Sequence, residues 1–204
     1  MLHFETIESS TLSLLRQLLS NRQFGEFYLA GGTSLALQLG HRKSFDLDFF
    51  GATEKSMSKI ATELRTFKNP REVSRSENNI VWMIDGVKVD FVNYWYPLIE
   101  NPILVDDLRL LSLKDIAAMK LEAIKGRGRK RDFYNIYFLL KQFSLEDLFS
   151  FHNKKFEEDS SFFVMKSLSY FHDAEEDPDI LTIQKDPGWD NVKKIISEAV
   201  INLC

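Results

Sequence analysis

The sequence lacks the features expected of a secreted or membrane protein. Its one cysteine, Cys204, is the last of 204 residues, so no internal disulfide can form. No stretch approaches the roughly 18 consecutive apolar residues of a membrane span. The N-terminal region has no basic segment followed by an apolar one, as a secretory leader would. We therefore expect a soluble, cytoplasmic protein with no membrane partner.

An excess of basic residues is also missing. The formal net charge is -4, with 26 Lys and Arg against 30 Asp and Glu. Proteins that grip long nucleic acid through their whole surface are usually basic. Any polynucleotide partner would therefore have to contact a local basic patch.

Apolar side chains, by contrast, are plentiful. They make up 44% of the residues and include 17 phenylalanines, which excludes a disordered chain and predicts a packed core. At about 150 residues per domain, the length fits one domain or two closely packed ones.

The first half of the chain alternates short apolar segments, typical of buried strands, with apolar stripes at helical spacing. A Gly-Gly pair ends the first strand, and Asp85-Gly86 is a strong hairpin signal between the last two. Strands are expected at residues 26–30, 46–50, 72–75, 80–84 and 87–94, and helices at 7–19, 33–39 and 57–67.

The second half is predicted to be helical. Residues 112–115, Ser-Leu-Lys-Asp, look like a capping box that opens a helix to about residue 124. Further helices are expected at residues 131–143, from 145 onward, at 162–171 and at 191–203. The prediction is an α/β (α+β) fold: a small mixed sheet with flanking helices over residues 1–105, and a helical subdomain over 106–204 packed on it.

Asp46-Leu47-Asp48 is the first candidate for chemistry. Residues two apart on a strand project from the same face, so both carboxylates would lie close together. Like charges that close raise each other's pKa, and a divalent cation with oxygen ligands, such as Mg²⁺, removes the conflict. The alternative is an exposed polar face. The apolar neighbours Phe45, Phe49 and Phe50 argue against it, because free carboxylates are costly in apolar surroundings.

Gly31-Gly32-Thr33 lies just upstream, between a predicted strand and a predicted helix. Glycines let backbone amides approach a phosphate, and the helix start adds a positive dipole end. Thr33 could cap that helix and offer a hydroxyl. A plain tight turn is the simpler alternative.

Asp90, on the polar face of a later strand, could complete a site with the two aspartates, for two metals or for one metal and a general base. The loop before Asp46 contains His41, Arg42, Lys43 and Ser44, and its basic side chains could bind phosphate oxygens. Solvent exposure is the alternative for Asp90 and for the basic side chains of this loop.

Two blocks of the sequence resemble the AbiEii/AbiGii nucleotidyltransferase family, whose members have a DNA-polymerase-β-like nucleotidyltransferase fold and act in abortive infection and type IV toxin–antitoxin systems. The first block covers residues 29–50 and the second covers 114–124 with Arg127 and residues 131–137. Together they cover about a quarter of the chain. One departure is visible: the family often has a second aspartate where Asn135 stands, and asparagine cannot act as a base.

The resemblance implies roles for individual residues. Asp46 and Asp48 would bind the catalytic metal, Mg²⁺ or alternatively Mn²⁺, with Asp90 as third carboxylate by analogy of fold. Gly32 and Thr33 would hold the triphosphate. Gly31, Arg42 and Ser44, from the same turn and the following loop, are the further candidates for binding the nucleotide. Lys120 and Asp132 would complete the site. If those two act in catalysis, we expect their removal to change stability little; a structural salt bridge between two helices is the alternative.

The basic segment Lys125, Arg127, Arg129, Lys130 and Arg131 is either a solvated loop or a dock for acceptor RNA phosphates. The predicted function is transfer of a nucleoside monophosphate from an NTP to an acceptor hydroxyl, on a tRNA 3′ end or a protein, by a toxin with a separate antitoxin protein. Two alternatives remain open: a non-catalytic nucleotide- or partner-binding module on the same fold, and a nucleotidyltransferase with a small-molecule, antibiotic-type acceptor.

Overall fold

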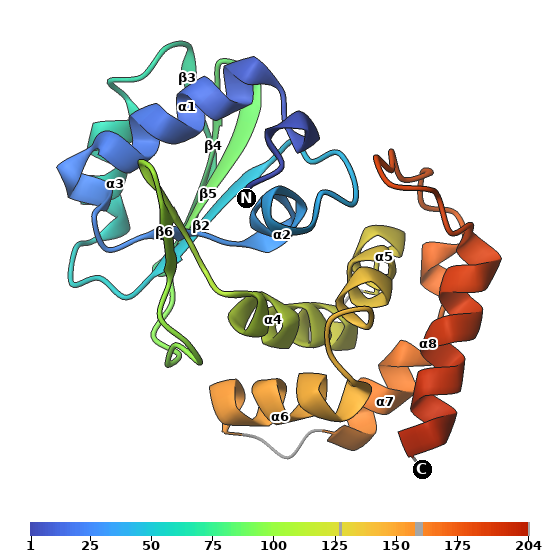
Figure 1. The fold of residues 1–204 in the computed structure, drawn as a ribbon. Coiled ribbons are helices and arrows are strands. Elements are labelled where there is room, and N and C mark those ends of the chain that lie inside the picture. The colour runs from blue at the N-terminus through green and yellow to red at the C-terminus, as the bar shows by residue number, and fades with distance from the viewer. Residues whose placement is uncertain (127, 158–160, 204) are drawn as a thin grey trace.

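The computed structural model describes residues 1–126, 128–157 and 161–203. These residues form an α/β fold in which helices flank a mixed seven-stranded sheet, as the sequence predicts (Figure 1). No helix in these ranges is long and apolar enough to cross a membrane.

The sheet has the strand order β3-β4-β5-β2-β1-β7-β6. Strands β2 and β5 are parallel neighbours at its centre, as are β1 and β7, and the other neighbouring pairs are antiparallel. The strands are β1 (Tyr28–Leu29), β2 (Leu47–Gly51), β3 (Pro70–Arg75), β4 (Asn79–Ile84), β5 (Val87–Asn93), β6 (Ile103–Val105) and β7 (Leu108–Leu110).

The helices begin and end close to the predicted residues. Ser144 and Asp147 form a complete capping box at the start of α6, and Gly40 ends α2 with a left-handed backbone. The α-helices are α1 (Ser9–Ser20), α2 (Gly31–Leu39), α3 (Met57–Leu64), α4 (Leu113–Gly126), α5 (Lys130–Leu139), α6 (Leu145–Phe156), α7 (Ser161–Leu168) and α8 (Trp189–Leu203). Short 3-10 turns lie at η1 (Phe4–Thr6), η2 (Arg22–Phe24) and η3 (His172–Ala174).

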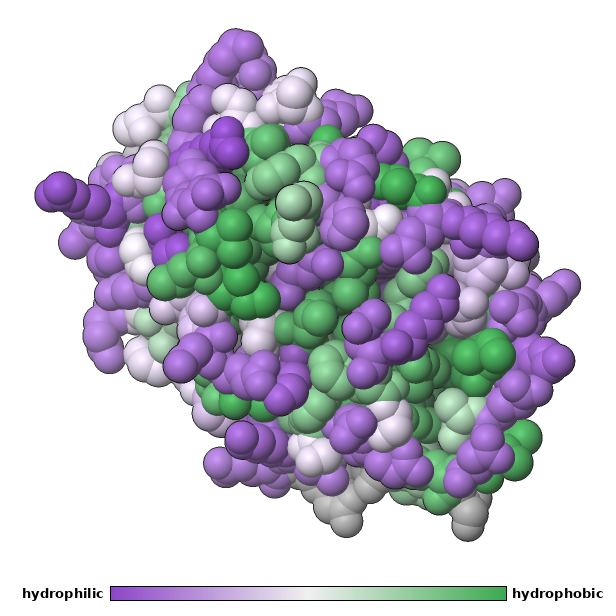
Figure 2. Space-filling view, viewed as in Figure 1, coloured by the Kyte–Doolittle hydropathy of each residue, from purple (hydrophilic) through white to green (hydrophobic). Residues whose placement is uncertain are grey.

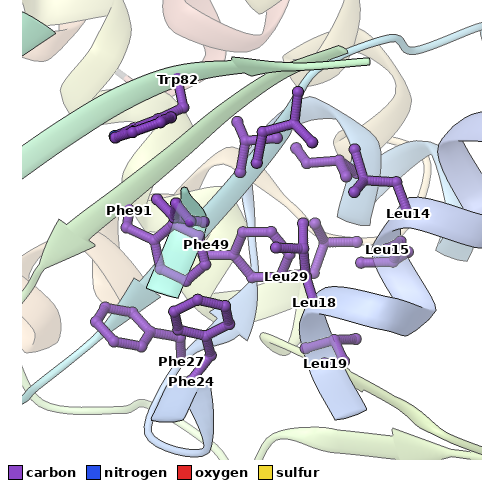
Figure 3. Close-up of a cluster of buried hydrophobic side chains, with 14 of the residues drawn as sticks. Leu14, Leu15, Leu18, Leu19, Phe24, Phe27, Leu29, Phe49, Trp82 and Phe91 are labelled. Carbon is purple, nitrogen blue, oxygen red and sulfur yellow. The ribbon is translucent and has the colours of Figure 1, made fainter. Parts of the chain in front are cut away.

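Two apolar clusters lie on opposite faces of the sheet. Along β2, Leu47 and Phe49 are fully buried in the cluster that α1 and α3 cover. Figure 3 shows Phe49 within this cluster, on the same side as the leucines of α1. Asp48 and Phe50 alternate with them and therefore face the other side. The second cluster is built mainly by α4, α5, α6, α7 and α8, which pack on that side in Figure 1. The alternation in β2 thus directs the aspartate toward the helical half of the chain.

A buried ion pair fastens α6 to α4. The Lys155 ammonium lies 2.8 Å from Asp115 Oδ1, and both side chains are fully buried. Lys155 also donates to the Pro97 carbonyl at 2.9 Å, and Asp115 accepts from the Ile99 amide at 3.0 Å. Because these extra hydrogen bonds satisfy the buried charges, the pair can hold the 97–100 loop against the helices.

The strands that differ from prediction are short ones. β1 begins at Tyr28 because Phe27 is still in the turn, its amide donating to the Phe24 carbonyl. β6 and β7 were not expected, since three-residue strands are too short to show a periodic pattern. The predicted boundary at residue 105 falls inside the hairpin that joins them.

The surface viewed from the side of Figure 1 mixes apolar and polar side chains. Apolar residues gather along the middle of this face, with polar residues around its border (Figure 2). This face is therefore not one continuous charged surface of the kind that tracks long nucleic acid.

A test of the first apolar cluster is the change Phe91→Ala. Phe91 is fully buried, and its ring centroid lies 4.7 Å from those of Phe24 and Phe49. We expect its removal to lower the free energy of unfolding by about 3–5 kcal/mol, measured by urea denaturation. Leu104→Ala, at a 69% exposed position, should change it by no more than about 0.5 kcal/mol. Similar losses in the two variants would contradict this description of the core.

Candidate active site

A pocket of about 300 Å³ lies between the polar face of the sheet and α4. Ile116 and Met119 of α4 form part of its wall, opposite Phe50 and Val92 of the sheet. Of the residues predicted from sequence, the pocket is lined by Gly31, Gly32, Arg42, Ser44, Asp46, Asp48, Asp90, Lys120 and Arg131. The fold therefore brings together segments that are up to 100 residues apart in sequence.

Asp48 and Asp90 lie side by side at this pocket. They are direct partners in the parallel pairing of β2 with β5, so their carboxylates leave the same face of the sheet. Burial raises the pKa of Asp48, and the negative charge of Asp90 raises it further. Asp46 directly precedes β2, is 36% exposed and lies 3.8 Å from the guanidinium of Arg131.

Lys88 is a pocket residue that was not singled out from the sequence. Its ammonium lies 2.7 Å from Asp90 Oδ2, and its side chain is 42% exposed. The signal was present, because Lys88 precedes Asp90 by two residues on one strand and must share its face. Lys88 compensates part of the charge that the two aspartates place together.

The carboxylates of Asp48 and Asp90 offer oxygen ligands of the kind that a divalent cation prefers. The buried Oδ1 of Asp90 has no hydrogen-bond partner in the described structure, although buried carboxylate oxygens normally have one. A cation between Asp48 and Asp90 would satisfy that atom and relieve their repulsion. Within the described ranges, no three His, Cys, Asp or Glu side chains form a ready-made metal cluster. The metal set of Asp46, Asp48 and Asp90 therefore stays a prediction.

The turn at Gly31 brings the backbone against these carboxylates. Gly31 has a φ of 64°, and a Cβ there would lie 2.1 Å from Asp48 Oδ2, so only glycine fits. Gly31 and Gly32 open α2, and no side chain caps this helix. Both glycines line the pocket. The first amide groups of a helix have no partners within it, and such helix starts often form anion sites.

Thr33 is placed differently from the expectation that it would hold the triphosphate. Its side chain is fully buried and does not line the pocket. Its hydroxyl is bonded to Ser44 Oγ at 2.8 Å and to the Asp46 carbonyl. Thr33 therefore fixes the loop that leads into β2, while Ser44 lies at the pocket wall.

His41, Arg42 and Asn135 form a buried cluster behind the pocket. Asn135 Oδ1 accepts hydrogen bonds of 3.0 Å from Arg42 Nε and from His41 Nε2. Burial lowers the pKa of His41 to about 3 and that of Arg42 to about 10. His41 is therefore neutral at physiological pH, and Arg42 keeps its positive charge.

Lys120 of α4 and Asp132 of α5 form a salt bridge of 2.9 Å. Lys120 is 9% exposed and lines the pocket, while Asp132 is fully buried behind it. The sequence left two alternatives, a catalytic pair whose loss changes stability little and a buried structural pair. The observed burial favours a large stability cost on removing either residue, because an unbalanced buried charge is costly.

The basic segment is only partly available to a ligand. Arg129 pairs with Asp177 at 3.0 Å, and Lys130 is buried, with its ammonium 2.6 Å from the Asp177 carbonyl. Arg131 is 49% exposed and reaches the pocket, whereas Arg127 lies outside the described residues. Lys125 pairs with Glu122 at 2.9 Å. Among the described residues of this segment, Arg129 and Arg131 keep the most exposed side chains.

Lys120→Met tests the buried pair. The change removes the ammonium that balances Asp132, and we expect the free energy of unfolding to fall by about 3–5 kcal/mol in urea titrations. The matched control is Lys68→Met, which breaks an exposed pair with Asp85 of similar length, 2.9 Å. That control should cost less than about 1 kcal/mol. An equally small loss for Lys120→Met would show that the pair is not buried in solution.

His41 should make stability depend on pH. Its folded pKa of about 3 lies below the reference value of 6.5, so the unfolded state binds more protons between these values. The stability due to the neutral ring is complete above pH 6.5 and is lost as the pH falls. The greatest slope is about 1.4 kcal/mol per pH unit. Denaturation at several pH values should show a steeper acid loss for the natural protein than for His41→Gln, and equal slopes would contradict the assignment.

The chain is similar to known proteins in sequence and in fold. A protein of Aquifex aeolicus (strain VF5), described as uncharacterized, is 37% identical over 183 residues, which cover 86% of each chain. The fold is similar to that of MenT4, the nucleotidyltransferase toxin Rv2826c from Mycobacterium tuberculosis H37Rv, with a TM-score of 0.65 and 16% identity over 96% of this chain and 82% of that one.

Two further solved structures share the fold. JHP933 from Helicobacter pylori has a TM-score of 0.58 at 17% identity, covering 97% of this chain and 93% of that one. ANT(2")-Ia in complex with adenylyl-2"-tobramycin has a TM-score of 0.55 at 13% identity, covering 71% and 95%. The family described as "Nucleotidyl transferase AbiEii toxin, Type IV TA system" matches residues 13–195. With that match over most of its length, the chain belongs to the AbiEii nucleotidyltransferase toxin family.

Proposed function

We propose that the protein transfers a nucleoside monophosphate from an NTP to an acceptor hydroxyl and releases pyrophosphate. The observation that carries the proposal is the position of Asp48 beside Asp90, at a pocket that also receives the uncapped start of α2. Carboxylates and phosphate-binding amides at one pocket suit a site where a triphosphate reacts.

The phosphates would lie along the positive side of the pocket. Gly31 and Gly32 line it at the start of α2, the guanidinium of Arg42 lies against Gly32, and Lys120 approaches from α4. Asp132 holds the Lys120 ammonium in place through their salt bridge. These donors would stabilise the negative charge that collects on the departing pyrophosphate.

Asp48 and Asp90 would hold the divalent cation, Mg²⁺ or Mn²⁺, with Asp46 next to them at the pocket mouth. When bound, the cation would neutralise charge on the triphosphate. Lys88 would leave Asp90 Oδ2 and become free to contact an anionic ligand, since its side chain is 42% exposed.

The chemical step exchanges one bond to the α-phosphorus for another. The acceptor oxygen forms a bond to it, the bond to the β-phosphate oxygen breaks, and the acceptor proton passes to a carboxylate. Asp90 and Asp46 line the pocket and can take this role. Asp132 is buried in its bond to Lys120 and is better suited to positioning that lysine.

The acceptor would approach past Arg131. This residue lines both the main pocket and a neighbouring hollow of about 250 Å³, which Arg129 and Asp177 also border. Guanidinium groups along such a path favour an RNA acceptor, including a tRNA 3′ end, because arginine binds phosphates with directed hydrogen bonds. A cognate antitoxin encoded as a separate protein is expected from the family.

A second candidate has a small-molecule acceptor. The chain shares its fold with ANT(2")-Ia, whose solved structure contains adenylyl-2"-tobramycin. Because the two chains are only 13% identical, this similarity supports the fold, and the acceptor has to be decided by experiment.

The decisive experiment incubates the protein with each α-³²P-labelled NTP, a divalent cation and either total RNA or aminoglycosides. We expect label in RNA that depends on Mg²⁺ or Mn²⁺ and is lost with EDTA. Asp48→Asn should reduce labelling by about 10²-fold or more, because it removes one charge of the central pair while keeping its shape. Asp85→Asn, on the β4–β5 turn, should retain activity.

The other outcomes separate the alternatives. Label in the aminoglycoside but not in RNA would favour the small-molecule reaction. NTP binding without any transfer would favour a non-catalytic module. Binding itself can be followed by thermal unfolding, since a ligand at 100 times its dissociation constant stabilises the fold by about 2.7 kcal/mol. No stabilisation by any NTP with Mg²⁺ would overturn the proposed function.

A further inference from the structure

Asn135 stands where the family often has an aspartate, and an asparagine cannot act as a base. It belongs to α5, is fully buried and does not line the pocket. Its Oδ1 nevertheless accepts two hydrogen bonds of 3.0 Å, one from Arg42 Nε and one from His41 Nε2. Within the described residues, its Nδ2 has no partner.

The Asn135 side chain is thus used only as an acceptor. A buried amide that leaves its donor unpaired costs free energy, so stability alone does not explain its presence. Aspartate would offer the same acceptor oxygen without an unpaired N–H group. What the site requires at this position is therefore an oxygen directed at Arg42.

The guanidinium of Arg42 is held on two of its nitrogens. Nε donates to Asn135, and Nη1 donates to the Lys43 carbonyl at 2.7 Å. Nη2 lies so close to Gly32 that a Cβ there would be 2.3 Å from it. Because Gly32 and Arg42 both line the pocket, the two inner bonds direct the remaining edge of the guanidinium to the start of α2.

The backbone of Arg42 is held separately, by residues 181–183 in the loop before α8. Arg42 forms an isolated antiparallel bridge with Thr182. The Lys43 amide donates to the Leu181 carbonyl at 2.7 Å, and the Ile183 amide donates to the His41 carbonyl at 3.0 Å. In Figure 1, the loop that precedes α8 approaches the loop that follows α2. With the backbone held in this way, the side chain of Arg42 takes its direction from its bonds to the Lys43 carbonyl and to Asn135, and Asn135 is the side-chain partner among the two.

We propose that Asn135 is a positioning residue that directs Arg42 at the phosphates of the bound NTP, and that it takes no part in proton transfer. This inference rests on the proposed function. It explains why asparagine can stand at this position in place of aspartate: the acceptor oxygen is needed, and the ability to act as a base is not.

The test is a double-mutant cycle on the full chain, with inorganic triphosphate and Mg²⁺ as the probe. Asn135→Ala and Arg42→Ala should each raise the dissociation constant by about tenfold, the loss of one charge-assisted contact. In the Arg42→Ala background, Asn135→Ala should have no further effect, because Asn135 acts through Arg42. Asn135→Asp, the conservative variant, should bind within about threefold of the natural protein.

Turnover gives a second readout that a structural role would not produce. Asn135→Ala should lower kcat/KM for the NTP by about as much as Arg42→Ala does, because it acts through the guanidinium. Asn135→Asp should leave the pH profile of kcat unchanged, whereas a new ionisation in that profile would assign a base to this position and overturn the proposal. Additive effects of Asn135→Ala and Arg42→Ala on triphosphate binding would also overturn it.

A measurement without ligand separates this inference from the proposed function. In ¹⁵N NMR spectra, the Arg42 Nε–H should exchange slowly with water in the natural protein and in Asn135→Asp, and rapidly in Asn135→Ala. Equal exchange in all three would sink the positioning role even if the protein transfers nucleotides. Failure of the natural protein to bind any triphosphate, with Arg42 protected as expected, would instead remove the proposed function.

Discussion

The site depends on one constraint, the parallel register that sets Asp48 beside Asp90. Two carboxylates on adjacent strands, partly withdrawn from water, repel each other, and this repulsion together with burial raises the pKa of Asp48. The surrounding structure supplies positive groups that reduce the cost: Lys88 on the same strand as Asp90, and the start of α2 at Gly31. The binding of a cation and of a polyanion at this site, as proposed, would relieve the same conflict.

The helical half supplies the pocket with the ammonium of Lys120. Lys120 reaches the pocket from α4 and is balanced by Asp132 on α5, so the two helices must pack correctly for the ammonium to face the carboxylates. Arg42 is likewise held from outside the sheet, by Asn135 on α5 and by the backbone of Thr182. The active pocket is therefore a property of the whole chain, and changes far from it in sequence can alter its charge.

Several parts of this arrangement could be predicted because they depend on local rules. Strand alternation places Asp48 opposite in direction to the buried Leu47 and Phe49, and Asp85-Gly86 forms the hairpin turn with both residues at positive φ. The strands β6 and β7 could not be predicted. Each has three residues, and β7 is in the sheet only because Leu110 pairs with Leu29, a contact across most of the N-terminal half.

The sequence by itself identified the Gly31-Gly32 turn and the acidic pair Asp46 and Asp48, together with the family to which the chain belongs. These follow from residue type and spacing along one strand and one turn. Only the tertiary structure decided which side chains the pocket exposes. It turned Thr33 inward to Ser44, buried Lys130 against the Asp177 carbonyl and left Arg131 at the opening. The physical reason is that burial and pairing of a charge depend on elements packed against it from distant parts of the chain, which no local pattern specifies.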